Sequence, residues 1–261
     1  MRITSIINLK GGVAKTISAA NVAHILATIH KKRVLLIDND KQGNVSKMFE
    51  LHSYDRPSIS DILTERSPNL AEIISKTKYE NLDIIPANMT LLRANFQIQI
   101  DTSKPRETRL RKQLENLKSD YDFCVIDCAP DLNISVINAL VASDDVLIPI
   151  KIDKFAFDGL AELLEQIENT REGLNPALTI AGAFVTMYQN NPVNSHGEEN
   201  LRKREDLRIF NTHIRRTEKI DESTFATAPI LDYSPSCGAA KDYLAFVLEY
   251  LNHGSDSDTQ K

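Results

Sequence analysis

The stretch INLKGGVAKTIS (residues 7–18) decides the expected fold of this chain. It contains the residue types of a phosphate-binding loop, whose standard pattern is G-x-x-x-x-G-K-[ST]. A pattern ending on Lys15 and Thr16 requires glycines at positions 9 and 14, where this chain has leucine and alanine. Its glycines stand at positions 11 and 12, and an additional lysine, Lys10, comes directly before them. The stretch is therefore a variant loop or a chance similarity.

The surroundings of this stretch favour phosphate binding. A strand-like segment (residues 3–8) comes before it and a helical segment (15–30) follows. Between a strand and a helix, loop N–H groups and the helix dipole attract an anion. Lys15 can reach the β- and γ-phosphates of a nucleotide, and the Thr16 hydroxyl can bind Mg²⁺. The alternative is a simple strand-to-helix turn that uses two glycines.

Apolar runs rich in β-branched residues alternate with helical segments along the rest of the chain. We expect strands at 34–38, 82–86, 122–127, 146–150 and 178–187, and helices at 106–118, 134–142 and 157–171. The runs are continuous rather than alternating, which is typical of strands buried on both faces. The sequence thus predicts an α/β fold with one doubly wound, mostly parallel sheet flanked by helices. Residues 1–252 are expected to form this single domain, with a disordered polar tail at 253–261.

Composition narrows the class of protein. The chain has 261 residues, a formal net charge of −5 and three cysteines. The charge gives no general attraction to nucleic acid, so any DNA binding must come from a local patch. We find no apolar run near the roughly 18 residues that span a membrane and no secretion leader. Cysteines this few do not indicate a disulfide scaffold, so the cytoplasm is the expected compartment.

Three aspartates follow predicted strands. Asp38 and Asp40 end the run VLLIDND, and Asp127 ends the run DFCVID. The carboxyl ends of parallel strands meet at the edge of the sheet where ligands bind. These carboxylates together with Lys15 therefore predict a site for a magnesium nucleotide. Each aspartate alone could be an ordinary strand-end cap.

Three motifs together resemble a known family. KGGVAKT (10–16), DNDKQGN (38–44) and VIDCAPDLN (125–133) resemble the deviant Walker A, A′ and B motifs of the ParA/Soj partition ATPases, in the wider MinD/ParA group. Later blocks, including residues 139–160 and 229–246, are similar to that family in the same order. The resemblance runs nearly from end to end and implies the P-loop NTPase fold of the deviant Walker A type.

The resemblance implies a role for each loop residue. Lys10 would reach across a homodimer to the phosphates of the partner's ATP, so that two nucleotides lie between two protomers. Lys15 would bind phosphate within its own protomer, and Asp40 would position the attacking water. The implied nucleotide-binding residues are Lys10, Gly11, Gly12, Val13, Ala14, Lys15, Thr16 and Ile17.

The resemblance also implies a magnesium site. Thr16, Asp40 and Asp127 would hold Mg²⁺, Asp127 through a water molecule, with Asp38 close by. Hydrolysis of ATP to ADP and phosphate should be slow.

Four positions depart from the family pattern. They are Ala14 for glycine, Ile17 for a hydroxyl residue, Lys41 for proline and Asp131 for serine.

Basic residues late in the chain suggest a DNA-binding patch. Arg216 matches a family position that contacts DNA without sequence preference. Its expected helpers are Arg215, Arg202, Arg204 and Lys219. For a generic protein, a solvated helical face of mixed charge would be the better interpretation. We keep that interpretation for a second basic run, residues 104–112.

The predicted function is thus that of a DNA partition ATPase in the bacterial cytoplasm, associated with the nucleoid. ATP would drive the dimer onto nonspecific DNA, and a ParB-like centromere-binding protein would stimulate hydrolysis. One alternative is a MinD-like regulator that cycles on a membrane, but no basic amphipathic segment follows the last helix. Another is a weakly hydrolysing scaffold. A third, an iron–sulfur protein, would use Cys124 and Cys128, which fit core packing better.

Overall fold

A single seven-stranded sheet forms the centre of the computed structural model, which describes residues 1–153 and 156–258. The strand order is β3-β4-β2-β5-β1-β6-β7, and every neighbouring pair is parallel except β3 with β4. The strands are β1 (Arg2–Ile6), β2 (Val34–Asn39), β3 (Ser75–Lys76), β4 (Leu82–Ile85), β5 (Phe123–Cys128), β6 (Asp145–Lys151) and β7 (Thr179–Thr186). The predicted α/β fold with one mostly parallel sheet is confirmed.

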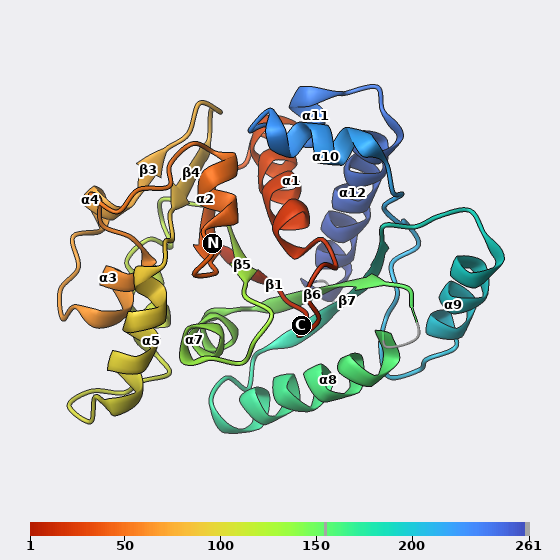
Figure 1. Ribbon diagram of the computed structural model, residues 1–261. Coiled ribbons are helices and arrows are strands. Elements are labelled where there is room, and N and C mark those ends of the chain that lie inside the picture. Colours follow the sequence, from red (N-terminus) through yellow and green to blue (C-terminus); the bar gives the residue numbers. More distant parts are fainter. Residues whose placement is uncertain (154–155, 259–261) are drawn as a thin grey trace.

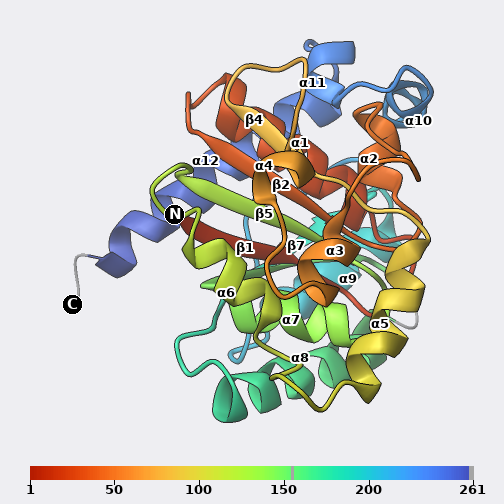
Figure 2. The same cartoon turned by 90° about the vertical axis from the view of Figure 1, so that its left-hand side faces the viewer.

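Helices cover both faces of the sheet (Figure 1). Helices α1 and α12 lie on one face, and α7 and α8 lie on the other, while Figure 2 shows the strands between them. The helices are α1 (Lys15–Thr28), α2 (Asn44–Met48), α3 (Ile59–Thr64), α4 (Leu70–Ile73), α5 (Thr90–Ile100), α6 (Arg109–Glu115), α7 (Ile134–Ala142), α8 (Ala156–Gly173), α9 (Pro192–Arg202), α10 (Glu218–Phe225), α11 (Ile230–Tyr233) and α12 (Gly238–Asp258).

Strand β2 shows why the apolar runs are continuous. Val34 and Leu36 point to the face covered by α1 and α12, where they join one buried cluster. Leu35 and Ile37 point to the opposite face and join a second cluster, with residues of α7 and α8. Because both faces are covered, no polar residue is needed at alternate positions.

The structure differs from the expected elements mainly at their ends. The helix expected over 106–118 is shorter, and α9 lies where the sequence predicted no helix. Asn191 caps that helix by accepting the N–H of Asn194, and Pro192 is its first residue. Helix α12 runs to Asp258, while residues 259–261 of the expected disordered tail lie outside the described residues.

Candidate functional site

The loop between β1 and α1 leaves its backbone open at the carboxyl end of the sheet. Gly12 and Ala14 both adopt left-handed backbone conformations, with φ of 71° and 63°. A Cβ added at Gly11 or Gly12 would meet no heavy atom within 4 Å. Within the described part of the chain, no acceptor is bonded to the N–H groups of residues 11–13. These N–H groups can therefore bind an anion at the start of α1.

Two lysines flank this loop. Lys15 is the first residue of α1, and its buried ammonium donates to the carbonyl of Lys10 at 2.8 Å. Burial lowers the pKa of Lys15, whereas the negative charge of Asp127 acts in the opposite direction. The ammonium of Lys10 forms an ion pair with Asp153, and both side chains remain about one-third exposed. Lys10 thus lies at the outer edge of the loop, in contact with the segment after β6.

Two buried carboxylates lie side by side behind the loop. Asp38 at the end of β2 and Asp127 at the end of β5 are directly paired in the sheet register. Asp38 accepts the backbone N–H of Ser46 at 2.8 Å and its hydroxyl at 2.6 Å. Burial raises the pKa of Asp38 to about 6 despite these bonds. Burial, followed by repulsion from Asp38, also raises the pKa of Asp127 well above its usual value.

Asp127 carries the clearest sign of an interaction partner. Neither of its carboxylate oxygens has a partner in good hydrogen-bond geometry among the described residues, although the side chain is buried and the Thr16 hydroxyl is close enough to act on its pKa in the lowering direction. A buried unpaired carboxylate is costly, and a nearby cation would relieve that cost. The donor set therefore fits Mg²⁺, which binds through carboxylates, hydroxyls, waters and nucleotide phosphates.

Asp40 lies in the turn after β2. Its carboxylate accepts the backbone N–H of Gln42 at 2.9 Å, and its side chain is only half buried. Its negative charge acts on the pKa values of both Lys15 and Asp127, which places it in the same electrostatic site. The structure thus brings Asp40, Asp127 and the phosphate-binding loop to one edge of the sheet, as the sequence predicts.

A cavity of about 280 Å³ adjoins the loop. The sequence did not predict most of the residues that line it. Gly12, Ala14 and Ile17 form the side that the motif predicts. The other side comes from the end of β7, from residues 214–224 and from Tyr243, and the surface of the cavity as a whole is mainly apolar. The Thr186 hydroxyl donates to the carbonyl of Val13 at 3.1 Å and ties β7 to the loop. The sequence did predict a strand over 178–187, and residues at its carboxyl end could have been assigned to this wall on that basis.

Most of the predicted DNA-binding residues are engaged within the chain. Arg202 pairs with Glu198, Arg204 with Asp206, Arg215 with Asp242 and Lys219 with Glu222. Arg216 is exposed and has no ion pair among the described residues. It lines both the 280 Å³ cavity and a neighbouring hollow beside Tyr188 and His213. Of the predicted patch, Arg216 is thus the residue most available to a ligand.

The cysteines on β5 show no arrangement for a cluster. Cys124 and Cys128 are buried free thiols, and Cys237 is partly exposed. Burial raises the pKa of Cys124 and brings that of Cys128 to about 12. Since metal clusters are held by thiolates, these raised pKa values favour a packing role for both residues on β5.

The chain matches one family model and is similar to several known proteins and solved structures. Residues 1–180 match the family model described as an AAA domain. The chain is 36% identical to the sporulation initiation inhibitor protein Soj of Bacillus subtilis over 255 residues, which cover 97% of this chain and 99% of Soj. It is 33% identical to the chromosome partitioning protein ParA of Caulobacter vibrioides over 260 residues, covering 98% and 96%. Its structure is similar to that of cobyrinic acid a,c-diamide synthase from Mycobacterium smegmatis with bound ADP and magnesium, with a TM-score of 0.84, 26% identity and coverage of 98% and 96%.

Proposed function

Because the chain belongs to the ParA/Soj family of P-loop ATPases, we propose that it is a DNA partition ATPase that works as an ATP-sandwich dimer. The observation that carries this proposal is the open loop with Lys10 at its edge and the unpaired Asp127 behind it. The loop offers N–H groups to phosphates, and the buried carboxylate offers a place for a cation. The same edge holds a cavity of a size suited to the nucleoside part.

The residues of the site would divide the work of phosphoryl transfer. Lys15 and the loop N–H groups would hold the β- and γ-phosphates, and residues 10–17 would surround them. Thr16, Asp40 and Asp127 would hold Mg²⁺, Asp127 through a water molecule, and the metal would neutralise charge on the phosphates. Asp40 would orient the attacking water. Its half-buried position lets it meet solvent, whereas Asp38 is held by Ser46.

Lys10 would link hydrolysis to dimerisation. Its ammonium lies outside the loop, so it can reach a phosphate presented by a second protomer once it leaves Asp153. A positive charge close to a triphosphate is worth far more in a water-excluded interface than in solution. ATP would therefore favour the homodimer, and hydrolysis would release it.

DNA and a stimulating protein would be the partners of this switch. Arg216, exposed and without an ion pair in the described chain, would contact DNA phosphates, with Arg215, Arg202, Arg204 and Lys219 contributing positive charge nearby. A ParB-like centromere-binding protein would stimulate the slow hydrolysis. The protein would then work in the bacterial cytoplasm, on the nucleoid.

The main rival is a membrane-cycling regulator. Among the described residues, none of the helices combines the length and apolar character needed to cross a membrane. Flotation with liposomes and ATP tests surface binding directly, and the partition model expects no ATP-dependent flotation. A weakly hydrolysing scaffold is excluded if ATP hydrolysis is measurable and is abolished by Lys15→Ala and by Asp40→Ala.

The deciding experiment is ATP-dependent DNA binding by the full chain. Wild type should bind nonspecific duplex DNA with ATP and not with ADP. The Lys10→Ala variant should bind DNA with neither nucleotide. Lys32→Ala, at an exposed lysine away from the loop, is the control and should bind as wild type. A dimer that neutralises about six phosphates should lose about a thousandfold in affinity between 50 and 200 mM salt. DNA binding that needs neither ATP nor Lys10 would refute the switch.

A further inference from the structure

A hollow of about 600 Å³ lies next to the 280 Å³ cavity and shares Arg215 and Arg216 with it. Its lining combines two arginines, two aromatic rings and two side-chain amides, and the described residues that form it include no carboxylate. They are Tyr188, Gln189, Asn190, His213, Arg215 and Arg216. A concave surface with this combination favours a ligand that has both a flat apolar part and a negative charge.

The two aromatic rings of the hollow are stacked on each other. The ring centroids of Tyr188 and His213 lie 3.8 Å apart, with 18° between the ring planes. Both side chains remain partly exposed. Proteins that bind single-stranded nucleic acids use such rings as platforms, because every base has a face that stacks on an aromatic side chain.

Polar groups beside the rings are available to the edge of a base. Gln189 and Asn190 are exposed, and their side-chain amides make no hydrogen bond within the described chain. The hydroxyl of Tyr188 is likewise without a partner among those residues. An amide offers both a donor and an acceptor, and these are the groups that bind the hydrogen-bonding edges of unpaired bases.

The charge of the hollow suits a phosphate. Arg216 is exposed and has no ion pair in the described part of the chain. Two carboxylates contact residues of the lining: Asp242 pairs with Arg215, and Glu198 lies 3.4 Å from the Nδ1 atom of His213. Glu198 is also neutralised by Arg202. Arg216 therefore supplies a positive charge that no described carboxylate cancels.

The backbone holds the rings and Arg216 in place before any ligand binds. The N–H of Tyr188 donates to the carbonyl of Ile214 at 2.9 Å, and the N–H of Arg216 donates to the carbonyl of Tyr188 at 2.8 Å. The N–H of Gln189 donates to the side-chain oxygen of Asn194 on α9 at 3.2 Å. Because these segments are already joined, binding would order little more than the exposed side chains.

We propose that this hollow binds an unpaired nucleotide of single-stranded DNA. The base would stack on the ring pair of Tyr188 and His213, and its phosphate would contact Arg216. The protein would therefore bind single strands in addition to duplex DNA. DNA as the source of the nucleotide rests on the proposed function, whereas the site itself does not.

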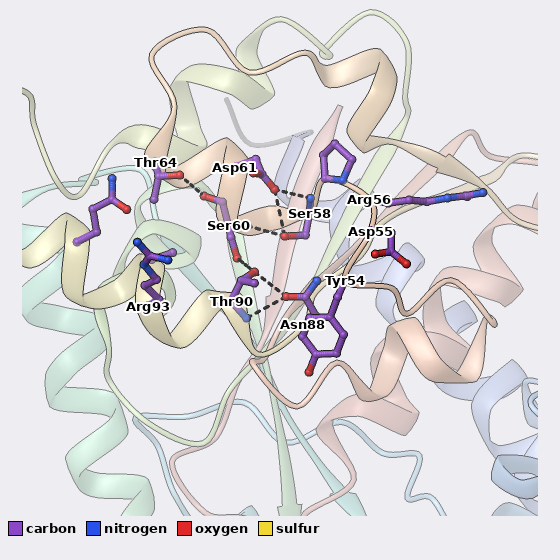
Figure 3. A pocket seen from close by; sticks show the side chains of 13 residues that line it. Tyr54, Asp55, Arg56, Ser58, Ser60, Asp61, Thr64, Asn88, Thr90 and Arg93 are labelled. Carbon is purple, nitrogen blue, oxygen red and sulfur yellow. Dashed lines mark hydrogen bonds between the residues drawn. The ribbon is translucent and has the colours of Figure 1, made fainter.

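A second hollow supplies the matched control. The hollow of about 470 Å³ beside α5 (Figure 3) also contains an exposed tyrosine, Tyr54. Tyr54 meets His52 edge-on, with 5.4 Å between the ring centroids and 88° between the planes. The charged side chains of this lining are of both signs: Asp55, Asp61, Arg56 and Arg93. Without a stacked pair or a positive balance, this hollow should not take a nucleotide.

The test compares a labelled single strand of about 20 thymidines with a duplex of the same length, each titrated with the full chain and ATP. Tyr188→Ala should weaken binding of the single strand by about tenfold or more and change duplex binding by less than about twofold. Tyr188→Phe keeps the ring and should bind the single strand as wild type does. Tyr54→Ala should leave both affinities unchanged, and Arg216→Ala should weaken both.

The outcomes separate this site from the proposed function. Equal single-strand affinity of wild type and Tyr188→Ala, no single-strand binding by wild type, or an equal loss for strand and duplex in Tyr188→Ala would overturn the site. ATP-dependent duplex binding by wild type would still support the partition function in each case. Absence of duplex binding by wild type would count against that function, while the effect of Tyr188→Ala on the single strand would still decide the site.

Thymidine monophosphate distinguishes a DNA strand from a free nucleotide. It brings a single phosphate, so it should displace the strand only at about a hundredfold excess over the nucleotides of the strand. Displacement at an equal concentration of nucleotides would overturn DNA as the ligand and assign the hollow to a free nucleotide.

Discussion

The ammonium of Lys41 lies 3.6 Å from the carboxylate of Asp131. Lys41 belongs to the turn after β2 that carries Asp40, and Asp131 belongs to the loop after β5 that carries Asp127. The two residues that depart from the family pattern in these loops are therefore an ion pair. The pair joins the segment that would orient water to the segment that would hold the metal.

We expect Lys41→Ala and Asp131→Ala to lower ATP turnover by a similar few-fold. Each removes the same connection between the two loops, so the double alanine variant should be no slower than either single one. The change in the free energy of unfolding should stay within about 1 kcal/mol, because the pair is partly exposed. Turnover measured over the four proteins gives the coupling. Additive losses would show that the residues act independently.

The ion pair of Lys10 with Asp153 should oppose dimerisation. Lys10 must leave Asp153 to reach a second protomer, and a partly exposed pair contributes up to about 1 kcal/mol. Asp153→Asn should therefore strengthen the ATP-dependent dimer by a few-fold, as measured by sedimentation. Asp206→Asn, which removes an exposed pair with Arg204 away from the loop, is the control. A weaker dimer in Asp153→Asn would mean that Asp153 supports the assembled state.

Adjacent arginines should respond differently to removal. Arg215 donates twice to the nearly buried carboxylate of Asp242, each time at 2.7 Å, whereas Arg216 has no such partner in the described chain. Arg215→Ala should cost about 1–3 kcal/mol of unfolding free energy, because Asp242 loses its ion-pair partner and keeps the backbone N–H of residue 215. Arg216→Ala should change stability by less than about 0.5 kcal/mol and still weaken DNA binding. Urea unfolding and DNA titrations on the same preparations separate the two effects. Equal stability of the two variants would contradict this assignment.

The sequence predicted the parts of the site that lie in one stretch of chain. Lys10, Lys15 and Asp127 could be placed because a strand, a loop and a helix follow one another around them. The wall formed by Met187 and residues 214–224 depends on how β7 pairs with β6, which a local pattern does not specify. The partners of the basic residues were missed for the same reason. Asp242 meets Arg215 only after α12 packs on the sheet.

The shortest helices could not be predicted from the sequence either. α2, α3 and α4 have four to six residues each, too few to show a helical period. The outward side of α5 was equally hidden, because Phe96 and Ile100 look like core residues in a sequence. Only their exposure in the folded chain distinguishes them from Leu91 and Ile98.

His24 should make the protein less stable in mild acid. It is buried on α1 against Tyr79, its Nδ1 atom lacks a partner in the described chain, and burial lowers its pKa to about 4. The charges of Asp232 and Lys78 act on it in opposite directions. Because the unfolded side chain binds its proton near pH 6.5, the unfolded state gains protons first as the pH falls. Stability that is complete above about pH 6.5 is then lost toward pH 4.

His24→Phe keeps an aromatic ring beside Tyr79 and removes the titrating group. From pH 7 to pH 5, wild type should lose about 2 kcal/mol more unfolding free energy than this variant. Urea unfolding at both pH values gives the change in unfolding free energy for wild type and for the variant. The contributions of the other titrating groups cancel when these two changes are subtracted. His196→Phe, at an exposed residue on α9, is the matched control and should follow wild type. Identical pH dependence of wild type and His24→Phe would contradict a buried neutral imidazole.

Ala14 holds a backbone conformation that suits glycine better. It precedes α1 with φ of 63° and ψ of 29°, where a Cβ costs about 1 kcal/mol or more. Ala14→Gly should relieve this strain, and the greater freedom of glycine in the unfolded chain offsets part of the gain. We expect a net stabilisation of up to about 1 kcal/mol in thermal unfolding without nucleotide. Ala27→Gly, inside the same helix, should instead destabilise by about 1 kcal/mol or more, because Ala27 also packs in the core.

The same substitution tests whether Ala14 weakens the grip on ATP. Ala14 lines the cavity next to the loop and directly precedes the first residue of α1. Removing its methyl group should let the loop close on the phosphates, so ATP affinity should rise by a few-fold in fluorescence titrations. Ile17→Thr, which restores a hydroxyl on the first turn of α1, should raise affinity independently. If Ala14→Gly is more stable but binds ATP no better, the departure at this position affects folding alone.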